Sequence, residues 1–217
     1  MNKKQIKRSK IGNARPVIRK EGDSMSEYNN FIKDYPDRCH ELLRLGFLAR
    51  MIGRDVTLML AIASTGINIP YERLKEPRNG RPDHPSNDRA KYTKAKDSFD
   101  KLLKEKFCGS VLWEINPGSW NFGALASIAG DPDVWPELRI NNPLPPNMTV
   151  EKVLNHLRNA MAHGCIFTQT GSPIKEIIFL SSKTYGSTDY NYILVSPADF
   201  KKFLYNWFEF TKGLDLT

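Results

Sequence analysis

The spacing of apolar residues along the sequence changes at Gly164, and this change most constrains how the chain can fold. Before it, apolar residues recur at steps of three and four, as on one face of a packed helix: Val150, Val153, Leu154, Leu157 and Met161. Thr149 suits the N-cap of this helix, Glu151 its first turn, and Gly164 a left-handed C-cap. Beyond Gly164 the period becomes two, so the helix is expected to lead directly into a sheet.

Three short strands are expected in the segment after Gly164, at 165–168, 174–180 and 190–195. Turn-forming residues at 171–173 and 183–188 separate them, which predicts a three-stranded antiparallel meander over about 165–195. Ser196 and Pro197 then form a typical helix start, and aromatic residues recur on one face of a last helix over about 197–212.

Upstream of Thr149 the pattern is mostly helical. Helices are expected at 24–33, 36–51, 55–64, about 87–107 and 119–129. Their signals are Ser24 or Ser26 as a cap, Pro36 in a first turn, Thr65-Gly66 as a stop, and Ser86 or Asn87 as a cap. The segment 131–147 holds five prolines and predicts an extended connector, with Trp135 and Leu144 fixing it to the surface. The predicted fold class is therefore mainly α, a helical bundle with a small β meander before the last helix.

The basic residues are concentrated at the N-terminus. Residues 1–20 hold eight lysines and arginines and no acid, which accounts for the net charge of +8. We expect residues 1–23 to be a disordered tail, either an electrostatic tether for nucleic acid or only a solubilising segment, and 24–217 to form one domain. The longest apolar run, 56–63, is too short for a bilayer, and the three cysteines suit a reducing compartment, so a soluble cytoplasmic chain is expected.

Three polar residues near the end of the 149–164 helix are the candidate site: Arg158, Asn159 and His163. The spacing of Arg158 and His163 is weak evidence by itself, because the chain holds 13 arginines and four histidines. Arg78 and His84 stand at a similar distance in a loop rich in proline and glycine, where nothing would hold their side chains in register. Arg158 differs in context, since its helix is buried, Ala160 and Ala162 keep its surroundings small, and Gly164 turns the chain.

The stretch LRNAMAHG at 157–164 closely resembles the Arg-polar-x(3–5)-His signature of HEPN domains. The resemblance is sharp over about 149–166 and looser through the strands and last helix to Phe210, in the manner of a plasmid- and prophage-borne branch. It implies a HEPN-like helical bundle. Many HEPN proteins are metal-independent ribonucleases that act as toxins or in phage defence, with a composite active site across a homodimer.

The residues could perform this chemistry. His163 titrates near neutral pH and can act as base or acid, Arg158 offers a planar fork of donors to phosphate oxygens, and Asn159 can orient either group. No metal or other cofactor is required. Five helical steps place Arg158 and His163 about 140° apart, so one chain is expected to supply only half of a site, and small Ala160 and Ala162 would let two such helices approach.

The predicted function is thus a HEPN-type endoribonuclease that acts on RNA as a homodimer. The alternative is a catalytically inactive HEPN module that dimerises and binds nucleic acid or a partner protein, such as a cognate antitoxin. An exposed Arg and a His in the last helical turn also occur without any functional role.

Two further residues of the same helix are candidates for contacting the substrate, namely Lys152 and His156. His156 lies seven residues before His163 and so on nearly the same face, which predicts a position at the rim of the site or on the helix surface. A metal site of His156 and His163 with Cys165 lacks a fourth ligand. Trp113, Trp120 and Trp135 could stack on bases, although buried tryptophans are more common.

Overall fold

The computed structural model describes residues 28, 30–77, 87–112, 120–125, 128, 130–169, 171–183 and 189–217. The expected tail at 1–23, the Arg78–His84 pair and Trp113 lie outside these residues. The described helices are α1 (Phe31–Arg44), α2 (Gly46–Met51), α3 (Asp55–Leu74), α4 (Thr93–Lys104), α5 (Val150–Ala162) and α6 (Pro197–Lys212). The strands are β1 (Trp120–Leu125), β2 (Ile166–Thr168), β3 (Ile177–Ser182) and β4 (Tyr190–Val195).

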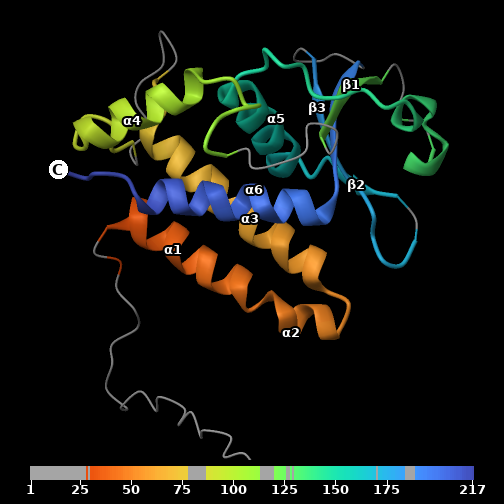
Figure 1. Ribbon diagram of the computed structural model, residues 1–217, viewed down its shortest axis with the longest axis horizontal. Coiled ribbons are helices and arrows are strands. Elements are labelled where there is room, and N and C mark those ends of the chain that lie inside the picture. Colours follow the sequence, from red (N-terminus) through yellow and green to blue (C-terminus); the bar gives the residue numbers. More distant parts are fainter. Residues whose placement is uncertain are drawn as a thin grey trace, which may run out of the picture.

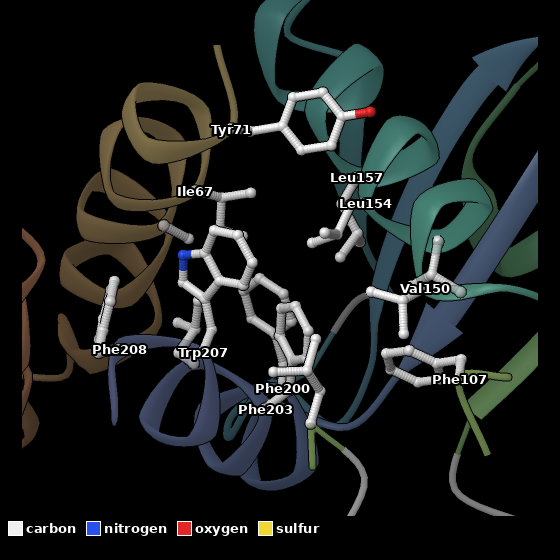
Figure 2. Packing of buried hydrophobic residues seen from close by; sticks show 14 of the residues in the cluster. Ile67, Tyr71, Phe107, Val150, Leu154, Leu157, Phe200, Phe203, Trp207 and Phe208 are labelled. Atoms are coloured by element: carbon white, nitrogen blue, oxygen red, sulfur yellow. The ribbon is translucent and has the colours of Figure 1, made fainter. Parts of the chain in front are cut away.

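The chain is mainly α-helical, and α6 crosses the middle of the molecule with α1 on one side and the sheet at one end (Figure 1). Aromatic side chains of α6 fill the space between α3 and α5 (Figure 2). Trp207, Phe200 and Phe203 are fully buried there, beside Ile67 of α3 and Leu154 of α5. None of the described helices is both long and apolar enough to cross a membrane.

The sheet has four antiparallel strands in the order β1-β4-β3-β2. The three strands expected after Gly164 are present as β2, β3 and β4. The sheet also contains β1, which the predicted three-stranded meander did not include. The segment 119–129 was expected to be helical. Instead Trp120 and Phe122 alternate with polar or small residues and pair with Val195 and Ile193 of β4, the period-two pattern of a strand.

Both faces of the two central strands are buried. Ile177, Phe179 and Ile193 pack on the helices, whereas the alternate residues Ile178 and Leu180 belong to a second cluster. Trp135 and Leu138 of the proline-rich connector cover that second face. The connector also contains two 3-10 turns, η1 (Pro132–Val134) and η2 (Pro136–Arg139). The prediction that Trp135 and Leu144 hold it in place is confirmed, because both side chains are buried.

Several predicted helix boundaries were wrong because tertiary packing outweighs local signals. Pro36 lies inside α1 and is buried, rather than starting a new helix, and α1 begins at Phe31. A turn at Leu45 divides the expected 36–51 helix into α1 and α2. The long helix expected from Ser86 or Asn87 begins only at Thr93 and ends at Lys104.

The helix expected to stop at Thr65-Gly66 continues through both Gly66 and Pro70 to Leu74. Gly66 is where α3 touches α6: a Cβ there would lie 2.7 Å from the Phe208 ring, and the Gly66 carbonyl accepts a 2.9 Å hydrogen bond from Trp207 Nε1. This glycine therefore allows two helices to approach and does not end one.

Replacing Gly66 with alanine is expected to destabilise the protein by about 1–3 kcal/mol, because the added methyl group overpacks against Phe208. The matched control is Gly46→Ala. An alanine Cβ at this helical position meets nothing within 4 Å, so the change should be neutral or stabilising by about 0.5–1 kcal/mol. Urea-unfolding midpoints of both variants measure the difference, and equal midpoints would contradict the close approach at Gly66.

Candidate functional site

α5 forms as its sequence predicts. The Thr149 side chain accepts from the Lys152 amide, the apolar residues of the helix are buried, and Gly164 adopts φ +67° directly after its end. The helix packs against β3 on one side and against α3 on another. Its polar residues are therefore divided among the sheet, the α3 contact and the solvent.

Arg158 faces α3, and its guanidinium is engaged by the protein itself. Nε donates to Asn68 Oδ1 at 3.1 Å and Nη1 donates to Asn155 Oδ1 at 3.3 Å. Nη2 forms an ion pair with Glu72, whose second carboxylate oxygen lies 2.5 Å from Lys75 Nζ. Arg158 thus joins α5 to α3 through a network of charged and amide groups.

An aromatic ring completes the surroundings of this guanidinium. The Arg158 Cζ atom lies 4.2 Å from the centroid of the Tyr71 ring, and the Tyr71 hydroxyl donates to Asn155 Oδ1 at 2.9 Å. Burial lowers the pKa of Arg158, and the neighbouring Tyr71 opposes that shift. The guanidinium remains a cation at neutral pH, held in one orientation by partners on three sides.

A hollow of about 180 Å³ opens beside Arg158. Its lining combines three cations with three carboxylates and three other residues: Lys75, Lys104, Arg158, Glu76, Asp100, Glu151, Tyr71, Leu103 and Asn155. The charges balance, so the hollow does not have the one-sided positive potential that attracts phosphate groups.

His163 and Asn159 are exposed at the other side of the helix end. His163 is the C-cap residue of α5, and its backbone N–H donates to the Asn159 carbonyl at 3.1 Å. Its imidazole has no hydrogen-bond partner among the described residues and does not line the hollow beside Arg158. Within one chain, Arg158 is therefore held in a fixed orientation and His163 lies in solvent. The two side chains do not meet.

Of the two alanines expected to leave room for a second helix, only Ala162 is exposed. Ala160 is completely buried. The expectation for Ala160 was wrong because this residue lies on the apolar face that α5 turns toward its own chain.

His156 was expected at the rim of the site or on the helix surface, and this is wrong. Its side chain is buried against β3, where Nε2 lies 2.7 Å from the Phe179 carbonyl and Nδ1 lies 2.8 Å from Ser181 Oγ. A neutral ring with its proton on Nε2 satisfies both contacts. Burial lowers the pKa of His156 to about 4, although the bond to Phe179 opposes the shift. His156 joins helix to sheet and has no ring nitrogen left for a substrate.

Lys152 is exposed in the first turn of α5. His163 follows eleven positions later, about 16 Å along a helix axis, so Lys152 lies far from His163. Trp120 and Trp135 are buried and cannot stack on bases. In the part of the chain that the structure describes, no three His, Cys, Asp or Glu residues are grouped as a metal site would require.

The family comparison agrees with the motif at the end of α5. Residues 25–213 match the model of the HEPN pEK499 p136 family. The chain belongs to this family. HEPN domains are modules of nucleotide-binding or RNase type, and they often bind RNA and dimerise. Searches among curated proteins and among solved structures find no significant match to this HEPN chain.

The α3 half of the Arg158 network was missed in the sequence. Asn68, Tyr71, Glu72 and Lys75 stand at positions i, i+3, i+4 and i+7, which is the spacing of one helix face. This polar stripe was not recognised because the helix was expected to end at Gly66.

The Glu72→Gln variant tests what the Arg158 network contributes to stability. The substitution keeps the shape of the side chain but leaves the half-buried guanidinium without its counter-charge, so we expect a loss of about 1–3 kcal/mol. Asp37→Asn is the matched control. It removes an exposed partner of Lys212 and should change stability by less than about 0.5 kcal/mol. Equal unfolding free energies for the two variants would show that Glu72 does not compensate Arg158.

The low pKa of His156 predicts a pH dependence of folding. The unfolded chain takes up a proton on this ring near pH 6.5 and the folded chain only near pH 4. The contribution of this ring to the free energy of unfolding is therefore fully present above pH 6.5. It should fall as the pH is lowered toward 4, by about 3 kcal/mol in total. Urea unfolding at several pH values measures this slope in wild type and in His156→Gln. The variant should have the shallower slope, and identical slopes would refute the assignment.

Proposed function

We propose that this chain is a metal-independent endoribonuclease of HEPN type, with a role as a toxin or in phage defence. One observation carries the proposal. In a member of a family of nucleotide-binding and RNase-type modules, the family's Arg–His pair ends a rigidly held helix, and the imidazole of His163 is exposed with no partner among the described residues. His156, in contrast, has both ring nitrogens engaged by its own chain.

The proposed reaction is attack of the RNA 2′-oxygen on the adjacent phosphorus, with breakage of the bond to the 5′-oxygen. His163 takes the proton of the 2′-hydroxyl or gives one to the leaving oxygen, a contribution of about 10²- to 10⁴-fold. Arg158 stabilises the charge that develops on the phosphate oxygens, and Asn159 positions the phosphate. The products are a 2′,3′-cyclic phosphate and a 5′-hydroxyl.

The composite site follows from the separation of the two groups. Arg158 is turned toward α3, whereas His163 is exposed at the helix end. A second copy that brings its own His163 to the Arg158 side would supply the missing group, so the proposed enzyme is a homodimer. RNA phosphate would then compete with Glu72 for Arg158, and Glu72 would keep its second partner, Lys75.

The engagement of Arg158 also favours a second candidate function. A guanidinium that is already bound to Glu72, Asn68 and Asn155 serves to join two helices, and the same fold could act without catalysis. In this alternative the protein dimerises and binds nucleic acid or a partner protein such as an antitoxin.

The decisive measurement is RNA cleavage by the purified full chain in EDTA, with the new 5′-hydroxyl ends detected by direct kinase labelling. We expect His163→Ala to lower the rate at least 100-fold while leaving the fold intact, because this side chain is exposed. His40→Ala is the matched control, since His40 pairs with Glu209 on α6 and should not affect cleavage. Wild type that cleaves no RNA, or a fully active His163→Ala variant, would contradict the proposal and leave the non-catalytic alternative.

The composite site has its own test. Arg158→Lys and His163→Ala chains, each inactive alone, are mixed under conditions that exchange subunits. If each site takes its Arg158 from one chain and its His163 from the other, a mixed dimer holds one intact site and activity should return to as much as about half per dimer. Absence of rescue in mixed dimers, or a strictly monomeric active enzyme by light scattering, would refute the composite site.

A further inference from the structure

The helix α2 presents large apolar side chains to solvent. It has no buried residue, and six side chains in and around it are at least 50% exposed: Leu42, Leu45, Phe47, Leu48, Met51 and Ile52. We call these six residues the α2 patch. Single exposed hydrophobic residues are ordinary, but a contiguous group of this kind marks an interaction site.

A groove adjoins the α2 patch. It has a volume of about 920 Å³ and lies between α2, the first turns of α3, the β2–β3 connection at 171–175 and the start of α6. Its apolar lining includes Phe47, Val56, Leu58 and Ile174, and Phe47 belongs to the patch as well. Neither Arg158 nor His163 lines it, and in Figure 1 α2 lies below α6 whereas α5 lies above it. The groove is therefore separate from the proposed nuclease site.

The charges around the groove are mainly positive. Arg44, Arg50, Lys175 and Lys201 line it together with a single carboxylate, Asp55. Among the described residues no salt bridge involves Arg44 or Arg50. Lys175 interacts electrostatically with the neighbouring carboxylate of Glu176, and Lys201 lies 5.7 Å from the Tyr205 ring centroid. This excess is local, because the chain from residue 21 onward is neutral overall.

We propose that this groove binds an amphipathic helix of a partner protein, with the apolar face of that helix on Phe47, Val56 and Leu58 and acidic residues along its margins. A helix laid into an apolar groove is a common mode of recognition, and it buries about two turns of side chains. Arg44, Arg50 and Lys175 supply the complementary charge that steers and orients the acidic margins.

Charge and shape argue against the other occupants of such a surface. A two-fold contact with a second copy would gather Arg44 and Arg50 of both chains in one interface, where Asp55 of each chain is the single carboxylate of the groove lining. A flat anionic membrane would leave a concave groove unfilled. Nucleic acid would satisfy the arginines but would leave the aliphatic side chains of the α2 patch in water.

The test uses the full chain and two labelled synthetic 18-residue helical peptides. Both carry leucine at i, i+3, i+4 and i+7 and alanine on the opposite face, and the positions that flank the leucines are glutamate in one peptide and lysine in the other. By fluorescence anisotropy we expect the glutamate peptide to bind with micromolar Kd and the lysine peptide at least tenfold more weakly. Phe47→Asp and Arg50→Glu, both at exposed side chains, should each weaken the glutamate peptide at least tenfold.

The matched control is Ile140→Asp, which places the same charge at an equally exposed apolar residue beside η2 and should leave binding unchanged. His163→Ala should also bind normally, so this test and the cleavage test fail independently. Equal binding of the two peptides, equal loss in Ile140→Asp, or no binding of the glutamate peptide would overturn the proposal. If the glutamate peptide does not bind, two further results would also overturn the proposal. Loss of self-association in Phe47→Asp by light scattering would indicate a second copy as the occupant, and Phe47-dependent binding to phosphatidylserine vesicles would indicate a membrane.

Discussion

The burial of α5 between α3 and the sheet is the constraint on which the rest of the arrangement depends. A helix with neighbours on two sides has little solvent-facing surface, so each polar residue on it needs a partner or must lie at an end. His156 meets this condition on the sheet side with the Phe179 carbonyl and Ser181, and Arg158 meets it on the α3 side with Asn68 and Glu72. Asn159 and His163 meet it by lying in solvent.

The same constraint separates Arg158 from His163, the two residues proposed as the catalytic pair. Arg158 is held rigidly because its charge requires compensation close to the core, and the networks that compensate it also fix its direction. His163 lies where the helical hydrogen bonds end and Gly164 turns the chain, so it is free to reach a substrate or another subunit. One side chain is preorganised and the other is available, a division that suits a site completed by a second chain.

At two positions glycine is required by close packing of a neighbouring side chain, and not by backbone flexibility. Gly66 lies where α3 meets Phe208 of α6, and a Cβ at Gly123 would lie 2.6 Å from the Tyr192 ring. The Tyr192 side chain crosses β1 at this point and its hydroxyl donates to the Glu137 carbonyl at 3.1 Å. The connector is thereby attached to the outer face of the sheet, whereas the α2 patch is not covered by the described chain.

The sequence alone determined the elements whose signals are local. The Thr149 cap, the apolar stripe of α5, the turn at Gly164, the strand at Tyr190–Val195 and the Ser196-Pro197 start of α6 all follow from capping, periodicity and backbone preference. The Arg158–His163 pair can be read from the sequence in the same way, and its role as a site stays a prediction. Only the tertiary structure decided that Pro36, Gly66 and Pro70 lie inside helices, that 120–125 joins the sheet as a strand, and that His156 is buried while Arg158 binds Glu72. These features depend on contacts between residues far apart in the chain, whose packing energy exceeds the local preferences by which a sequence is interpreted.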